Sequence, residues 1–109
     1  MIEHDITPIV DYIIQKNGVI KIKGLEEKFK IGLRTLEKEF IQHIGLSPKE
    51  FARVTRFNAL FAEIKTDPSV SWSEIIDKYG YYDQSHFIRD FQHFTGQSPT
   101  DFLKVRQLD

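Results

Sequence analysis

With 109 residues, of which 40% are hydrophobic and 28% charged, the chain can bury one core, and we expect a single domain spanning residues 1–109. It has no cysteine, which excludes disulfide bonds and thiolate chemistry. It also lacks an apolar run of the roughly 18–20 residues that a membrane helix needs. A formal net charge of -1 is low for a nucleic-acid-binding protein and predicts weak non-specific affinity for DNA.

The first two predicted helices are separated by a short extended stretch. Thr7-Pro8 begins a helix, with threonine as the N-cap and Ile9, Val10, Ile13 and Ile14 as its apolar face. Asn17-Gly18 supplies its left-handed end. Residues 19–23 alternate apolar and basic side chains, but this stretch is too short and isolated to pair as a strand. We therefore interpret it as an extended connection to a helix at about residues 24–30.

A third helix is predicted at about residues 33–44, and it completes a first helix-turn-helix at about residues 19–45. Its apolar residues are Leu36, Phe40, Ile41 and Ile44, which we expect to face inward, and Gly45 ends it. Glu37 and Glu39 are more typical of solvated helix charges than of ligand contacts, and for Glu37 both interpretations stay open.

The second half of the chain begins with a strong helix start. Ser47-Pro48-Lys49-Glu50 is a capping box, and it opens a helix that reaches about residue 65, a rod of about 27 Å. A second capping box begins at Ser71, and a sixth helix starts after an N-cap at Asp83 or Ser85. Ser98-Pro99 starts the last helix. The prediction is an all-α fold of seven helices, with a linker helix at about 47–66, a second helix-turn-helix at about 71–96 and a C-terminal helix at about 98–107.

The two halves also repeat one pattern of residues at a constant offset. Two copies are too few for a solenoid, which needs at least three stacked units, so a duplicated motif inside one domain fits better. The matching pairs, each 51 residues apart, are Leu36 and Phe87, Lys38 and Arg89, Phe40 and Phe91, Gly45 and Gly96, Ser47-Pro48 and Ser98-Pro99, Glu50 and Asp101, and Phe51 and Phe102.

The second copy resembles the AraC/XylS family of transcription regulators. The similarity lies in residues 80–87 (GYYDQSHF), followed by Arg89, Phe91, Phe94, Gly96 and Ser98-Pro99, and the first copy carries a matching pattern from Leu36 to Phe57. The resemblance covers the chain from about residue 7. It implies the DNA-binding domain of a regulator that binds double-stranded DNA. Without a cysteine, a membrane-length apolar run or a secretory signal in the sequence, we expect a cytoplasmic protein. In this family another domain usually binds an effector or dimerises, and RNA polymerase is a further expected partner.

The resemblance also assigns residues that would read DNA bases. In the first recognition helix they are Leu33, Arg34, Glu37 and Lys38. Arginine and lysine can donate to guanine, and a glutamate can accept from cytosine.

In the second recognition helix, the residues implied are Gln84, Ser85, His86 and Arg89. Glutamine can pair with adenine and arginine with guanine. With the linker helix between them, the two recognition helices would lie about one duplex turn, ~34 Å, apart and enter successive major grooves.

Contacts with DNA phosphates are expected from Lys21, Lys23, Ser71 and Trp72. Trp72 is an equally good packing anchor. The first motif departs from the family pattern at its recognition-helix N-cap, where Gly32 replaces a polar residue.

Other functions fit the sequence less well. Asp83, His86, Asp90 and His93 share one helical face, but ligands along a single helix cannot surround a metal ion, so we expect no metal and no cofactor. No nucleophile–base pair or phosphate-binding loop predicts an enzyme. The alternative is a helix-turn-helix-derived protein-interaction module with weak DNA affinity, because the net charge is low and the first motif departs from the pattern.

Overall fold

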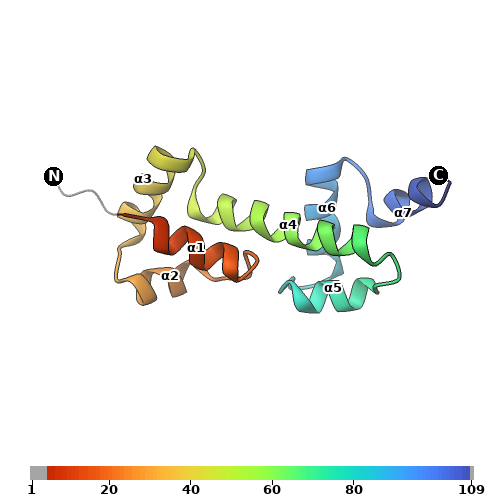
Figure 1. The fold of residues 1–109 in the computed structure, drawn as a ribbon, viewed down its shortest axis with the longest axis horizontal. Coiled ribbons are helices and arrows are strands. Elements are labelled where there is room, and N and C mark those ends of the chain that lie inside the picture. Colours follow the sequence, from red (N-terminus) through yellow and green to blue (C-terminus); the bar gives the residue numbers. More distant parts are fainter. Residues whose placement is uncertain (1–4, 109) are drawn as a thin grey trace. The chain divides into compact units, whose positions relative to one another are not determined.

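The structure, a computed structural model, describes the backbone of residues 5–108 and the side chains of residues 5–103. Over that range the chain folds into seven α-helices without a strand, which confirms the predicted all-α class (Figure 1). The helices are α1 (Thr7–Gln15), α2 (Ile22–Phe29), α3 (Leu33–Ile44), α4 (Pro48–Thr66), α5 (Trp72–Lys78), α6 (Gln84–Thr95) and α7 (Pro99–Leu108).

The chain divides into two compact units, one ending at Ala59 and the other beginning at Leu60. The helix α4 contributes residues to both units, because it runs from Pro48 to Thr66. The first unit otherwise holds α1, α2 and α3, and the second holds α5, α6 and α7.

Serine caps begin three of the helices. At α4 the Glu50 backbone N–H donates to Ser47 Oγ over 3.1 Å, and the Ser47 backbone N–H donates to Glu50 Oε1 over 3.0 Å. The Ser47 N–H also holds the pKa of the Glu50 carboxyl below its usual value. Ser71 Oγ and Ser98 Oγ each accept from the backbone N–H three residues on, over 3.1 Å, at α5 and α7. Both predicted capping boxes therefore mark helix starts.

Two predicted starts near the N-terminus are wrong. Thr7 is the first residue of α1 rather than its N-cap, and its N–H donates to the Asp5 carboxylate over 3.0 Å. The extended stretch ends at Lys21, and α2 begins at Ile22, two residues earlier than predicted. Ile22 starts the helix there because its side chain packs against the core of the first unit.

The core of the first unit is aliphatic, with one aromatic ring. It consists of Ile6, Ile9, Ile13, Leu25, Ile31, Leu36, Phe40 and Ala52. The turn after α1 lies directly on α4: a Cβ placed on Gly18 would lie 2.6 Å from the Arg56 backbone nitrogen. Gly18 also has a φ of +74°, in the left-handed region that favours glycine. The close contact and the backbone conformation therefore both require a residue without a side chain here.

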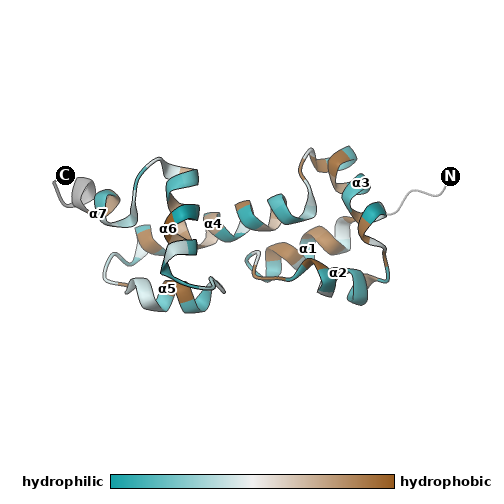
Figure 2. Ribbon diagram, turned by 180° about the vertical axis from the view of Figure 1, so that it is seen from behind, coloured by the Kyte–Doolittle hydropathy of each residue, from teal (hydrophilic) through white to brown (hydrophobic). Residues whose placement is uncertain are grey.

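Two isoleucines that were expected to be buried are exposed. Ile14 on α1 is 52% exposed and Ile41 on α3 is 53% exposed. Hydrophobic and hydrophilic residues follow one another along α3 (Figure 2). The buried stripe of this helix, Leu36 and Phe40, is narrower than predicted, and Ile41 lies outside it.

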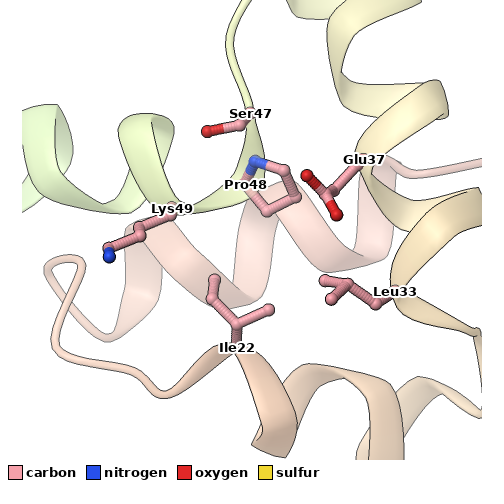
Figure 3. A pocket seen from close by; sticks show the side chains of 6 residues that line it. All are labelled: Ile22, Leu33, Glu37, Ser47, Pro48 and Lys49. Carbon is pink, nitrogen blue, oxygen red and sulfur yellow. The ribbon is translucent and has the colours of Figure 1, made fainter.

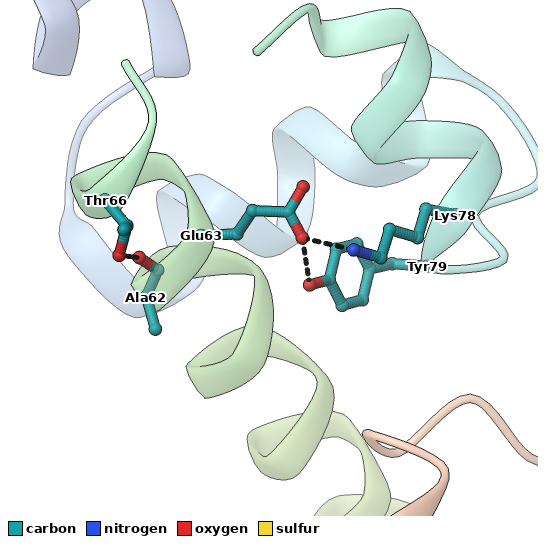
Figure 4. A network of polar contacts seen from close by, with 5 residues as sticks. All are labelled: Ala62, Glu63, Thr66, Lys78 and Tyr79. Carbon is teal, nitrogen blue, oxygen red and sulfur yellow. Dashed lines mark hydrogen bonds and ion pairs between the residues drawn. The ribbon is translucent and has the colours of Figure 1, made fainter. Parts of the chain in front are cut away.

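The core of the second unit is mainly aromatic. Its buried residues include Leu60, Ile64, Ile75, Tyr79, Tyr81, Phe87 and Phe91. The Phe91 ring packs against Phe87 at 5.9 Å and Phe102 at 5.6 Å between centroids. Near the end of α4, Glu63 Oε1 accepts from Lys78 Nζ over 2.6 Å and from Tyr79 Oη over 2.8 Å, which ties α4 to α5 (Figure 4).

The 51-residue repeat of the sequence is a repeat of structural roles. Phe40 in α3 and Phe91 in α6 are both fully buried. Gly45 and Gly96 end these two helices with left-handed φ values of 85° and 75°. Each residue of α3 therefore has an equivalent residue in α6, 51 positions further along the chain.

Candidate DNA interface

In the first unit, α2, a three-residue turn and α3 position the predicted base-reading residues. Lys30 ends α2 in the left-handed region, with a φ of 51°, and Ile31 is buried in the core. Gly32 is the N-cap of α3 and offers no side-chain hydrogen bond. The packing of Ile31, rather than a polar cap, thus fixes where α3 begins.

All four candidates on α3 lie on its outer side. Leu33, Arg34, Glu37 and Lys38 are exposed, while Leu36 between them is fully buried. At about 100° per residue, positions i, i+1, i+4 and i+5 of a helix share one face. The structure therefore brings these four residues together on a single surface of the first unit.

A shallow hollow of about 300 Å³ adjoins this surface, where the starts of α2, α3 and α4 meet. Figure 3 shows the side chains of Ile22 and Leu33 directed into it from two helices. Pro48 lines it from α4. The apolar character of Leu33 thus continues into the adjacent surface.

In the second unit, the turn before α6 carries a polar cap that the first unit lacks. Asp83 Oδ1 accepts from the His86 backbone N–H over 2.8 Å. His86 Nδ1 accepts from the Tyr82 backbone N–H over 3.5 Å, and its ring lies edge-on to Tyr81 at 5.0 Å. With Nδ1 as the acceptor, a neutral His86 ring carries its proton on Nε2, which can donate outward.

The other three candidates on α6 are exposed. Gln84, Ser85 and Arg89 lie on the outer side of the helix, and His86 is partly buried at its edge. Phe87 and Phe91 occupy the opposite, buried side. The four candidates of α6 thus share one surface of the second unit.

The candidates for phosphate contacts divide into free and engaged side chains. Lys21, the N-cap of α2, and Lys23 in its first turn are exposed. Ser71 is exposed, but its hydroxyl oxygen caps α5. The partly buried Trp72 ring packs on Phe87 at 5.7 Å between centroids, which makes it a packing anchor as well as a candidate contact.

Each recognition helix also contains a buried acid that faces its core. Asp90 is 2% exposed and its Oδ2 accepts from Tyr81 Oη over 2.8 Å. Glu39 is 6% exposed, so its interpretation as a solvated charge is wrong. The Glu39 carboxylate lies 3.2 Å from His43 Nε2, but its Oε2 has no hydrogen bond of good geometry. Both acids are buried and do not face the outer surface.

The described part of the chain shows neither a metal-binding cluster nor a membrane-spanning helix. No group of three or more histidine, cysteine, aspartate or glutamate side chains among residues 5–103 could hold a metal ion. Of the four residues on the α6 face considered for a metal, Asp83 caps the helix and Asp90 is buried against Tyr81. None of the described helices is both long and apolar enough to cross a membrane.

Sequence reasoning missed two residues of the outer surfaces, Ile41 and Gln92. Both are exposed, and they occupy equivalent positions in α3 and α6. Each follows the first residue of its helix by eight positions, so it shares a face with Leu33 or Gln84. That spacing was the available signal, and the assignment of Ile41 to the core obscured it.

Comparison with known proteins agrees with this geometry. A family model described as a helix-turn-helix domain matches residues 25–105. The chain is 32% identical over 85 residues to the HTH-type transcriptional activator RhaS of Salmonella arizonae, and equally to those of Salmonella paratyphi B and Salmonella newport. The match covers 77% of this chain and 30% of each relative. No solved structure matches the chain. The chain belongs to the AraC/XylS family, as a helix-turn-helix DNA-binding domain of a transcriptional regulator.

Proposed function

We propose that the chain binds double-stranded DNA in a sequence-specific manner, with α3 and α6 each entering a major groove. The observation that carries this proposal is the pair of equivalent outer faces. On both helices exposed side chains lie opposite a buried stripe, and three of the four candidates on each helix are related by the 51-residue repeat: Leu33 and Gln84, Arg34 and Ser85, and Lys38 and Arg89. An α-helix that presents such a face is the element that reads the major groove in helix-turn-helix proteins.

The leading base-reading residues are basic in both helices. Arg34 and Lys38 on α3 and Arg89 on α6 are exposed donors that suit guanine O6 and N7. Gln84 at the start of α6 suits adenine. Lys38 and Arg89 are equivalent, but only arginine can donate two hydrogen bonds in a fixed planar geometry, so α6 is the more selective reader.

The length of α4 supports a spacing of about one duplex turn between the two recognition elements. Its 19 residues at ~1.5 Å each give about 28 Å. Successive major grooves on one side of a duplex recur every ~34 Å. On this ground we propose that a single chain engages two successive grooves without a second copy, and the spacing of the selected DNA elements tests it.

Contacts with DNA phosphates would hold the two recognition helices in place on the duplex. Lys21 and Lys23 are exposed around the start of α2 and carry charge that a phosphate can neutralise. The net charge of -1 limits the number of such contacts. Binding should therefore depend on sequence more than on charge alone, and its salt slope should be modest.

The relatives are longer than this chain, which spans 30% of their length. We propose that the regulator also contains a domain that binds an effector or dimerises, and that RNA polymerase is a partner in the cytoplasm. Within this scheme the chain acts by binding, without a cofactor and without catalysis.

The experiment that tests the proposal is selection of bound duplexes from a random pool, followed by affinity measurements against salt. Two enriched elements about one turn apart are the expected result. Replacement of one arginine, Arg89→Ala, should cost about 1–3 kcal/mol and relax specificity at one base pair of one element. Lys16→Ala, which removes an exposed lysine from the end of α1, is the control and should leave the preference intact.

Three outcomes would count against this mechanism. A single enriched element would mean that only one helix reads DNA. Uniform weakening by Arg89→Ala across all sequences would make Arg89 a phosphate contact. Absence of any enriched sequence would favour the alternative, a protein-interaction module with weak DNA affinity.

A further inference from the structure

The recognition helix α3 exposes two large apolar side chains where the other recognition helix exposes none. Leu33 is 43% exposed and Ile41 is 53% exposed. They are two of five large hydrophobic residues exposed in the described part of the chain, and α6 carries none of the five. Exposure of an isoleucine on a short amphipathic helix is unfavourable in water, so these two positions are candidates for burial against a ligand.

Both residues lie within the face that is proposed to read DNA. Leu33, Glu37 and Ile41 follow each other at intervals of four residues and form one stripe along α3. At about 100° per residue, Ile41 lies between Glu37 and Arg34 around the helix axis, on the side away from buried Phe40. Around the axis Ile41 thus falls within the reading face, and along the axis it lies about one turn beyond Lys38, toward the end of α3.

The equivalent positions of α6 carry different chemistry. Leu33 corresponds to Gln84 and Ile41 to Gln92, each 51 residues further along the chain. Both glutamines are exposed. One helix therefore presents two amides, which pair with adenine, where the other presents two branched aliphatic side chains.

The chemistry of the major groove offers one apolar group to such side chains, the C5-methyl group of thymine. Arg34 and Lys38 precede Ile41 by seven and three residues on the same side of α3, and both are exposed. Charged residues are depleted at the centre of protein–protein interfaces, whereas a DNA groove places phosphates and base edges on both sides of a central apolar contact. The surroundings of Ile41 therefore favour DNA as its occupant.

We propose that α3 selects thymine through apolar contact of Ile41, aided by Leu33, with thymine methyl groups. This inference rests on the proposed function and adds the base that the first recognition helix prefers. The two helices then read DNA by different means: α3 by methyl contact and basic donors, α6 by amide and basic donors.

The test replaces thymine by deoxyuridine, which removes only the C5-methyl group. In the duplex obtained by selection, each thymine of the element not assigned to Arg89 is replaced in turn, and the affinity is measured. At one or more positions the chain should bind about three- to tenfold more weakly, the effect of one lost buried methyl contact. Ile41→Ala should weaken binding to the thymine duplex and should no longer distinguish thymine from deoxyuridine there.

The matched control is Ile14→Ala. Ile14 is 52% exposed on α1, almost the same as Ile41, but it lies outside the reading face. It should keep the full preference for thymine. Ile41→Gln, which copies the residue of α6, provides a second variant, and circular dichroism of each variant verifies that the helices are intact.

The outcomes separate this inference from the proposed function. Equal affinity for thymine and deoxyuridine at every position of that element, with Arg89→Ala still relaxing the other element, would overturn thymine reading and leave DNA recognition standing. Persistence of the deoxyuridine effect in both Ile41 variants would also overturn it, because another group would then contact the methyl. Absence of any selected sequence would remove the proposed function itself, and the inference with it.

Discussion

The two recognition motifs, α2 with α3 and α5 with α6, share a buried frame and differ at their surfaces and turns. Leu36 and Phe87, and Phe40 and Phe91, are buried at equivalent positions. The turn of the second motif is two residues longer, since residues 79–83 separate α5 from α6, whereas residues 30–32 separate α2 from α3. The comparison teaches that the frame constrains a few buried positions, while the outer faces can differ, with Leu33 and Ile41 on α3 where α6 has Gln84 and Gln92.

The buried acids show how a change in the turn alters the inside of a motif. Asp90 in the second motif receives a hydrogen bond from the hydroxyl of Tyr81. In the first motif the buried residue of the turn is Ile31, which has no hydroxyl to donate. Glu39 has instead a longer side chain and the neighbour His43 on the next helical turn. The substitution of one turn residue thus coincides with a different partner for the acid.

The two units also hold α4 in different ways. In the first unit, the turn after α1 approaches the backbone of α4 at Gly18. In the second unit, Glu63 of α4 accepts hydrogen bonds from Lys78 and Tyr79. One contact depends on the absence of a side chain and the other on a carboxylate, so the two should respond differently to mutation and to pH.

Gly18→Ala should have the largest effect on stability. The new Cβ would overlap the backbone of α4 near Ala52 and Arg56, and the φ of +74° is unfavourable for alanine. We expect a loss of about 3 kcal/mol or more in the free energy of unfolding, measured by urea denaturation. Gly24→Ala is the control, because nothing lies within 4 Å of its Cβ position in α2. That variant should gain about 0.5–1 kcal/mol, and equal losses in both variants would contradict the close contact at Gly18.

Glu63→Gln should lower the free energy of unfolding by about 1–2 kcal/mol at neutral pH, because it weakens the hydrogen bonds from Lys78 and Tyr79. The Lys78 ammonium, followed by the Tyr79 hydroxyl, lowers the pKa of the Glu63 carboxyl below its usual 4.5. A carboxyl whose pKa is lower in the folded state than in the unfolded state stabilises the fold at pH values above its unfolded-state pKa. This stabilisation is lost as the pH falls through the folded-state pKa. The difference between wild type and Glu63→Gln should therefore be complete at pH 7 and shrink below about pH 4.5.

Burial and the same carboxylate raise the pKa of Tyr79 to about 12, so the hydroxyl stays protonated throughout this range. Thermal unfolding at several pH values measures the difference. Glu27→Gln, a change at an exposed carboxylate on α2, controls for net charge and should alter stability little. A difference for Glu63→Gln that is the same at pH 3 and pH 7 would mean that the charge of Glu63 contributes nothing.

Much of the fold could be predicted because its signals are local. The reciprocal cap at Ser47 and Glu50 and the left-handed Gly45 and Gly96 are written within a few residues of the helix ends that they define. The errors arose where packing decided the outcome. Ile22 joins α2 because it reaches the core, and Ile41 lies outside the buried stripe although its side chain is apolar.

The base-reading candidates could be predicted as faces, because helical spacing places them together. What the sequence pattern alone could not decide is how much of each side chain the neighbouring elements cover. Trp72 is engaged with Phe87 from another helix, and Glu39 is enclosed although it is charged. Both outcomes depend on contacts between elements that are distant in sequence, which helical periodicity does not encode.

Gly32→Ser should have the smallest effect, and it would make the two motifs more alike. Gly32 has φ and ψ of −70° and 152°, close to the −79° and 148° of Ser71, which caps α5. No atom lies within 4 Å of a Cβ at this position, so the serine hydroxyl can accept from the N–H groups at the start of α3 without displacing a neighbour. A gain of a few tenths of a kcal/mol is expected in urea denaturation.

Asp83→Gly in the second motif, where the cap to His86 is lost, should cost a similar amount. If Gly32→Ser gave no gain while Asp83→Gly gave a loss, the packing of Ile31 alone would fix the start of α3. A polar cap would then add no stability to the first motif.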